Sequence, residues 1–138
     1  MTGQYQHTID AKGRLFIPAK LREELGETFY ITISDEPCLC IYSEETWQRM
    51  NEQFKSAPYS KARGMRVIFA LAAKCEPDAQ GRILLPQKLR ALKALEKDVT
   101  VVGVPGHAEI WNTDTWNEME RVELEPENLR AILEEFGF

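Results

Sequence analysis

The chain has 138 residues and a mass of 15.9 kDa, which suits one compact domain or two small fused ones and excludes a large multidomain enzyme. Its 43% apolar and 28% charged residues exclude disorder and fibrous repeats, and its net charge of −5 argues against a protein that coats nucleic acid. The longest apolar run has seven residues from Val67, and the polar start lacks a signal-peptide core. We therefore expect a cytoplasmic protein without a membrane partner.

The charge is sorted by segment along the chain. Residues 1–22 carry a net charge of +3 and residues 60–93 carry +6, whereas residues 23–54 and residues 107–138 carry −7 each. Amphipathic helices with acidic outer faces would explain a single acidic segment. The two basic segments, however, are copies of each other.

The chain contains an internal duplication. Residues 10–22 (DAKGRLFIPAKLR) align without gaps on residues 78–90 (DAQGRILLPQKLR) and are identical at eight of thirteen positions. The match resumes downstream, where residues 41–50 align on residues 110–119. A period near 68 residues is longer than that of solenoids and propellers, so the pattern predicts a doubled domain.

In the first copy, the turn signature Asp-Ala-x-Gly is typical of a hairpin, because Asp10 can accept a local backbone hydrogen bond and Gly13 can adopt a positive φ. Pro18 suits a helix start and Gly26 its end, while Ser43 can cap a second helix. We expect strands at residues 4–9, 14–17, 28–33 and 38–42, paired as two successive hairpins. On the second helix Trp47, Met50 and Phe54 share one face, which favours core packing.

The rest of the chain repeats this plan. Residues 60–73 have helical apolar spacing despite Gly64, which predicts an amphipathic linking helix. Strands are expected at residues 73–77, 82–85, 99–104 and 108–111, and Thr113 is the expected cap of the helix that carries Trp116. A last helix is expected near Pro126, with an apolar stripe at Leu129, Ile132, Leu133 and Phe136.

This pattern divides the chain into four parts. We expect one module at residues 4–47, a helical linker at residues 48–72, a second module at residues 73–116, and a C-terminal helical segment at residues 117–138. The fold class expected from the sequence is therefore α+β, built from two copies of one module.

The three cysteines give no disulfide framework or zinc pattern. Cys38, Cys40 and Cys75 are odd in number, and their C-x-C spacing differs from the C-x-x-C of zinc sites. Neither His7 nor His107 has a cluster of Cys, Asp or Glu at ligand spacing among its sequence neighbours. We expect reduced core thiols, no metal and no cofactor.

The sequence also lacks the groups that an enzyme would need. It shows no nucleophile with a base and no phosphate-binding glycine loop. Asp10 and Asp78 are the one candidate carboxylate pair for an acid protease, but Ala follows each of them where that chemistry needs small hydroxyl residues. We therefore expect no catalysis and no small-molecule substrate.

The positive signal is Asp-x-x-x-Arg across a turn, present twice as Asp10 with Arg14 and Asp78 with Arg82. One interpretation is structural: the aspartate caps the turn and pairs with the arginine, which contributes about 0 to 1 kcal/mol at an exposed site. We favour a functional role for the arginines, since a two-stranded ribbon fits the DNA major groove and arginine can reach guanine edges or phosphates.

These doubled motifs, the two Thr-Trp-x-x-Met helices and the chain length resemble the MraZ family of the SpoVT-AbrB superfamily. The resemblance implies an AbrB-like swapped-hairpin β-barrel, formed by the two modules around a pseudo-twofold axis with flanking helices. It further implies a ring-like homo-oligomer that presents its motifs to double-stranded DNA. The family is regarded as nucleoid-associated transcription regulators of the cell-division and cell-wall gene cluster, which bind short G-rich direct repeats upstream of their own gene.

Carried onto this chain, the resemblance and the turns give six expected DNA-binding residues: Asp10, Lys12, Arg14, Asp78, Gln80 and Arg82. Gln80 stands where the first copy has Lys12, so the two copies are not expected to contribute equally. Two other hypotheses stay open. The first is an antitoxin-like protein-binding module with the acidic C-terminal segment as its tail, although the regular stripe after Pro126 favours a docked helix. The second is an oligomeric scaffold.

Overall fold

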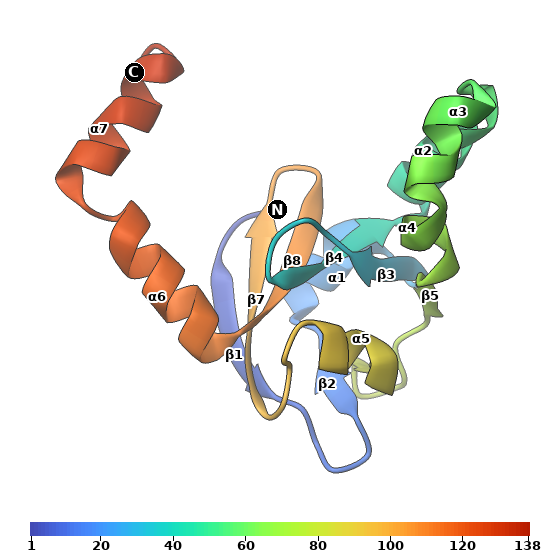
Figure 1. Cartoon of the computed structure of the whole chain (residues 1–138). Coiled ribbons are helices and arrows are strands. Elements are labelled where there is room, and N and C mark those ends of the chain that lie inside the picture. The colour runs from blue at the N-terminus through green and yellow to red at the C-terminus, as the bar shows by residue number, and fades with distance from the viewer.

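The computed structural model describes residues 1–138 as a mixed α+β protein (Figure 1). Its strands are β1 (Gln4–Thr8), β2 (Arg14–Phe16), β3 (Phe29–Ile33), β4 (Cys38–Ser43), β5 (Ala73–Cys75), β6 (Arg82–Leu84), β7 (Asp98–Val104) and β8 (His107–Asn112). Its helices are α1 (Ala19–Leu25), α2 (Glu44–Ser56), α3 (Tyr59–Ala62), α4 (Arg66–Ala70), α5 (Gln87–Leu92), α6 (Thr113–Glu123) and α7 (Pro126–Glu135). The order β-β-α-β-β-α therefore occurs twice, as the duplication predicts.

Six strands form one antiparallel sheet in the order β1-β7-β8-β4-β3-β5, and β2 pairs with β6 in a separate two-stranded ribbon. The large sheet has β1 and β5 as its edges, so no closed barrel is formed by the strand pairing. The α+β class is confirmed.

The second hairpin of each copy is confirmed, because β3 pairs with β4 and β7 pairs with β8. The first hairpin of each copy is wrong as a strand pair. β1 pairs with β7, β5 pairs with β3, and β2 pairs with β6, so each of these strands finds its partner in the other half of the chain. The two copies have the same alternation of apolar residues, and this alternation does not say which copy supplies the partner.

The main core is shared by both halves. Leu15 and Ile83 lie directly opposite each other in the ribbon, and both are buried in an 18-residue cluster with residues of the large sheet. Because side chains alternate along a strand, their neighbours Arg14 and Arg82 lie on the other face of the ribbon. Burial of one ribbon face thus fixes the orientation of the arginines.

Two helical arms extend from opposite sides of the sheet in Figure 1, one formed by α2, α3 and α4 and the other by α6 and α7. In the first arm Trp47 is buried and stacks on Tyr30 with ring centroids 4.9 Å apart, which confirms its packing role. The linking segment is not one helix, because a 3-10 turn at Arg63–Met65 separates α3 from α4. Gly64, a poor helix former, lies in that turn.

The caps of the two longer helices differ from each other. The Ser43 hydroxyl accepts a hydrogen bond from the Thr46 N–H at 3.2 Å, so this cap is confirmed. The expected Thr113 cap is wrong. Asn112 occupies the cap position, and its side-chain oxygen accepts from the N–H of Asp114 at 2.9 Å.

The C-terminal helix α7 forms where it is expected but does not dock on the body of the chain. All its residues are exposed, including Ile132 at 54%, and Phe136 just beyond the helix is 71% exposed. The stripe therefore does not pack on the body of its own chain, and docking on a neighbouring subunit stays a prediction. None of the helices combines the length and the apolar character needed to cross a membrane.

Candidate functional site

The first Asp-x-x-x-Arg turn is organised by one carboxylate. Asp10 Oδ1 accepts hydrogen bonds from the backbone N–H groups of Lys12 and Arg14, both at 2.9 Å. Asp10 Oδ2 accepts from Nε of Arg14 at 2.7 Å. Gly13 has φ of +82°, which allows the chain to turn back toward Asp10. The arginine is thus held through Nε, and its two terminal nitrogens stay free of bonds within the chain.

The second turn reproduces this geometry. Asp78 Oδ1 accepts from the backbone N–H groups of Gln80 and Arg82 at 2.9 Å, and Oδ2 accepts from Nε of Arg82 at 3.0 Å. Gly81 has φ of +79°. The side chains of Arg14 and Arg82 are 34% and 30% exposed, so both side chains are half-buried at the surface.

The ribbon joins the two turns into one surface. Arg14 lies opposite Leu84, and Phe16 lies opposite Arg82, so the arginines are diagonal neighbours on the same face, with Cα atoms about 7–8 Å apart. The N–H of Ile17 donates to the carbonyl of Gly81 at 2.9 Å, and a matching bond links Leu85 to Gly13. We call the two turns with the outward face of this ribbon the ribbon surface. In Figure 1 it lies at the end of the molecule away from α7.

A second pair of arginines lies over the turns. Arg22 of α1 donates from Nε to the Ile17 carbonyl at 2.9 Å, and its guanidinium lies against Gly81, with Cζ 2.9 Å from the position of an added Cβ. Arg90 of α5 makes the equivalent bond to Leu85 at 3.0 Å and lies against Gly13. Each turn therefore combines its own arginine with one from the other half of the chain.

The electrostatics of the turns follow from these bonds. The pKa of Asp10 is lowered from 3.8 chiefly because the backbone N–H of Arg14 donates to the carboxylate, with a further contribution from the Arg14 side chain. The pKa of Asp78 is lowered from 3.8 in the same way by Arg82. Both aspartates are therefore ionised at neutral pH, and each neutralises part of the charge of its arginine.

The comparisons with known proteins agree with the duplication and the turns. The family model described as "MraZ protein, putative antitoxin-like" matches residues 1–66 and 68–135, which is nearly the whole chain in two consecutive parts. The chain belongs to the MraZ family. It is 48% identical over 118 residues to a protein of Heliobacterium modesticaldum and to one of Carboxydothermus hydrogenoformans, covering 83% of this chain and 82% of each relative. A protein of Thermoanaerobacter sp. is 49% identical over 121 residues, with coverage of 86% and 85%. All three relatives are named "Transcriptional regulator MraZ".

The structure places all six expected residues of this MraZ chain in the two turns. Asp10 with Arg14 and Asp78 with Arg82 form the ion pairs, while Lys12 and Gln80 are exposed at equivalent positions of the turn tips. Sequence reasoning missed the grouping of Arg22 and Arg90 with these turns. The signal was present, since the two arginines occupy matching positions of the repeat, but their contact with the opposite copy depends on the strand exchange.

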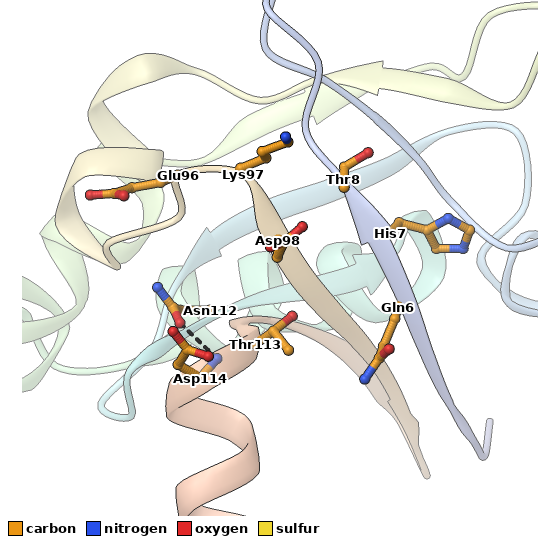
Figure 2. A pocket seen from close by; sticks show the side chains of 9 residues that line it. All are labelled: Gln6, His7, Thr8, Glu96, Lys97, Asp98, Asn112, Thr113 and Asp114. Atoms are coloured by element: carbon orange, nitrogen blue, oxygen red, sulfur yellow. Dashed lines mark hydrogen bonds between the residues drawn. The ribbon is translucent and has the colours of Figure 1, made fainter.

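A polar pocket of the MraZ chain lies apart from the ribbon surface (Figure 2). It is lined by Gln6, His7, Thr8, Glu96, Lys97, Asp98, Asn112, Thr113 and Asp114. Figure 2 shows β1 and the start of β7 on one side of it and the first turn of α6 on the other. The lining contains three carboxylates and one lysine, so the pocket is acidic and differs from the mostly apolar sites that bind small molecules. It contains none of the six expected residues.

A group of side chains of the kinds that ligate metals lies on the face of the large sheet opposite the main core, which we call its outer face. The thiols of Cys38 and Cys40 and a carboxylate oxygen of Glu109 all lie within 4.8 Å of one another. His107 Nε2 is 2.9 Å from Glu109 Oε2, so the cross-strand register assembles a group that the sequence spacing did not predict. The pKa of Cys40 is lowered because the Cys38 thiol hydrogen-bonds to it, and the pKa of Cys38 is raised by the same bond.

Proposed function

We propose that this chain is a non-enzymatic, sequence-specific DNA-binding transcriptional regulator. The observation that carries the proposal is the ribbon surface, on which two Asp-anchored arginines lie side by side with their terminal nitrogens free. Arginine in this state can bind guanine edges with two hydrogen bonds, or phosphate oxygens. The names of the relatives, all transcriptional regulators, support the same function.

The six residues of the two turns are the proposed DNA contacts and anchors. Arg14 and Arg82 reach the DNA, Asp10 and Asp78 hold them, and Lys12 and Gln80 lie at the turn tips. Arg22 and Arg90 support the turns from the opposite half and add positive charge. Four guanidinium groups against two carboxylates leave this surface cationic, although the whole chain carries −5.

The fold proposed for the modules is the swapped-hairpin arrangement of the SpoVT-AbrB superfamily. The exchange of β1, β5 and the ribbon strands between halves supports it. The proposed modules are residues 4–47 and 73–116, with residues 48–72 and 117–138 as helical segments. Both modules then contribute one turn to a single DNA-binding surface.

Copies of the chain are proposed to assemble into a ring through the two arms. The first arm has a basic stretch at residues 55–70, with Lys55, Lys61, Arg63 and Arg66 and no acid. Residues 118–138 have seven carboxylates against two arginines, a net charge of −5, and an exposed apolar stripe. Two different complementary surfaces on one chain make a head-to-tail contact, which closes into a ring when the rotation allows it.

A ring would explain how a chain of net negative charge binds specific DNA. One ribbon surface makes few phosphate contacts, which alone gives dissociation constants near 10⁻⁴ to 10⁻⁶ M, typical of nonspecific binding. Several linked surfaces on spaced repeats gain about 10² to 10⁴ in avidity. The proposed target is therefore a set of short direct repeats upstream of the chain's own gene, in the cell-division and cell-wall gene cluster.

The test is binding of the full chain to that upstream DNA and to a scrambled duplex of equal length and composition, between about 50 and 200 mM salt. We expect a preference for the upstream DNA that persists as the salt concentration rises. The double variant Arg14→Ala with Arg82→Ala is expected to lose this preference while keeping its fold and assembly. The control is Arg49→Ala, which removes an exposed arginine on α2, outside the ribbon surface and outside the basic stretch of residues 55–70, and its mass should equal that of the unmodified assembly.

The antitoxin-like hypothesis is the second candidate, and the exposure of α7 favours it. An acidic helix with exposed Leu129, Ile132 and Leu133 suits a protein partner as well as a second copy. If the chain is monomeric and binds upstream and scrambled DNA equally, while a purified toxin-like protein binds α7, this function replaces the regulator. Equal binding to both DNAs by an assembled chain without such a partner would favour the scaffold.

A further inference from the structure

The group of thiol, carboxylate and imidazole side chains on the outer face of the sheet lies at the junction of the two halves. The strands β4 and β8 are neighbours at the centre of the sheet, and Cys40 lies directly opposite Glu109. The repeat offset of 69 residues makes these same two positions equivalent in the two copies. Cys38 is equivalent in the same way to His107. One copy therefore supplies two thiols, and the other supplies a carboxylate and an imidazole at the matching positions.

The side chains converge because of the alternation along each strand. Cys38 and Cys40 are two residues apart on β4 and share the outer face of the sheet with Glu109 of β8. The three donor atoms lie within 4.8 Å of one another. Tetrahedral zinc with bonds of about 2.3 Å to sulfur needs donor atoms about 3.8 Å apart. Side-chain rotations that move the donor atoms by about 1 Å would therefore bring them into ligand geometry.

Glu109 is held in place by two further hydrogen bonds. The indole Nε1 of Trp111 donates to Oε1 at 3.0 Å, and His107 Nε2 lies 2.9 Å from Oε2. Each carboxylate oxygen has two acceptor sites, so one lone pair on each remains for a metal. A ligand whose orientation is fixed by outer hydrogen bonds is characteristic of metal sites in proteins.

The surroundings also suit a bound cation. Cys38 is fully buried and Cys40 is 5% exposed, with Val102 and Trp111 beside them, while the Glu109 side chain is 13% exposed and that of His107 is 29% exposed. The site is thus closed on the thiol side and open to solvent past the imidazole. The third cysteine, Cys75, is buried in the main core, apart from this group.

We propose that Cys38, Cys40 and Glu109 bind a thiophilic divalent cation of the zinc class, with His107 as a positioning residue that holds the carboxylate. Thiolate ligands select soft and borderline metals over magnesium and calcium. Binding replaces the two S–H bonds by two metal–sulfur bonds, and the two protons go to solvent. The two thiolates then balance the charge of the cation. The carboxylate is the third ligand and keeps its contact with the His107 imidazole.

The experiment measures binding of zinc ions alone to the full chain, by competition with a chromophoric chelator under reducing conditions. Cadmium ions serve as a second probe, because sulfur-to-metal charge-transfer absorbance reports thiolate ligation. We expect one ion per chain and thiolate absorbance for the unmodified chain and for the control Cys75→Ala. Cys40→Ala and the double variant Cys38→Ala with Cys40→Ala are expected to lose both signals.

Two further variants keep the test independent of folding. Glu109→Gln retains an acceptor for Trp111 but loses the charged ligand, and it is expected to bind zinc more weakly. His107→Gln is expected to weaken zinc binding about 10- to 100-fold, as loss of outer hydrogen bonds does at metal sites, with an unchanged unfolding midpoint in the absence of metal. An unmodified chain that binds no zinc, or a Cys38/Cys40 double variant that binds it as tightly as the unmodified chain, would overturn the proposal. So would unchanged zinc affinity in both Glu109→Gln and His107→Gln.

Discussion

One aspartate in each turn makes the arginine available to a partner while limiting its motion. The carboxylate accepts two backbone N–H groups and the guanidinium Nε, so the side chain and the turn are fixed together. Such anchoring lowers the entropy that a long side chain loses on binding. The same carboxylate cancels part of the positive charge, which favours directed hydrogen bonds over indiscriminate attraction to phosphate.

The turn tips differ at one position, and this difference predicts a change in salt dependence. Lys12→Gln makes the first tip equal to the second and should reduce the slope of log K against log salt by about one per phosphate contact that is lost. Gln80→Lys should steepen the slope by a similar amount, because it adds the missing cation. Titrations of the upstream DNA between about 50 and 200 mM salt measure both slopes. If neither variant changes the slope, the tips do not contact phosphate.

The aspartates should titrate below their ordinary value. A carboxyl whose folded-state pKa is depressed stabilises the fold above its unfolded pKa of about 3.9, and this contribution is lost as the pH falls through the folded value. NMR titration of the Asp10 and Asp78 carboxyl carbons should give pKa values below 3.8. In Arg14→Ala the pKa of Asp10 should rise only in part, because the backbone N–H of residue 14 still donates to the carboxylate.

That partial rise separates the two causes. Asp78 provides the control within the same variant, since its own arginine is intact and its pKa should not change. A pKa of Asp10 that reaches 3.8 in Arg14→Ala would mean that the side chain, and not the backbone N–H, is the main cause of the shift.

At the scale of the elements, each turn depends on a glycine that lies under a guanidinium from the opposite half. Gly13 and Gly81 have φ of +82° and +79°, and a Cβ there would lie 3.0 Å or less from Arg90 and Arg22 respectively. Gly26 has φ of +83° but no neighbour within 4 Å of an added Cβ, so it is a matched control. All three positions have a positive φ, which strains any residue with a Cβ, and only Gly13 and Gly81 have a guanidinium beside them, whereas Gly26 ends α1 with ψ of −169°.

Alanine at each of these glycines should lower the free energy of unfolding by about 1–3 kcal/mol, the cost of a sparsely populated positive-φ conformation for a residue with Cβ. Only Gly13→Ala and Gly81→Ala should also weaken DNA binding, because the added methyl group displaces Arg90 or Arg22. Urea denaturation and binding to the upstream DNA give the two quantities separately. Equal loss of DNA binding in Gly26→Ala would show that the guanidinium contacts are not responsible.

The local signals in the sequence predicted the turns, most strands and the helix starts, because each depends on neighbouring residues. Asp10 and Gly13 specify their turn within five residues, and the six expected site residues follow from it. The partners of the strands could not be predicted in this way. β1 and β5 carry equivalent patterns, and their choice of the opposite half is decided by burial across the whole molecule.

The same limit explains the residues that were missed. Arg22 reaches Gly81, and Cys40 faces Glu109, only after the two halves have exchanged strands and β4 has paired with β8. No spacing within one module encodes these contacts. The Asn112 cap is a different case, because Asn and Thr are both good caps and adjacent in the sequence, and only the backbone geometry decides between them.

At the scale of the whole molecule, the segregation of charge follows the shape. The ribbon surface is at one end, and the acidic C-terminal arm extends away from it, which keeps carboxylates off the proposed DNA face (Figure 1). Leu129, Ile132 and Leu133 of α7 are all exposed on the single chain, and a continuous apolar stripe of this kind is typical of an interaction surface. Contact between the basic stretch of the first arm of one copy and the acidic arm of the next would cover this stripe and orient the ribbon surfaces alike.

This contact predicts a charge-exchange result. Arg63→Glu with Arg66→Glu makes the first arm repel the C-terminal arm, and Glu134→Arg with Glu135→Arg reverses the other side, so each pair alone should reduce the chain to smaller species. All four changes in one chain restore opposite charges and should restore the assembly, since a head-to-tail contact needs only complementarity between its two surfaces. Light scattering coupled to size-exclusion chromatography measures the mass, and binding to the upstream DNA should follow it because avidity depends on the number of linked surfaces. If the fourfold variant stays dissociated while each chain remains folded, the arms do not form the contact by charge complementarity.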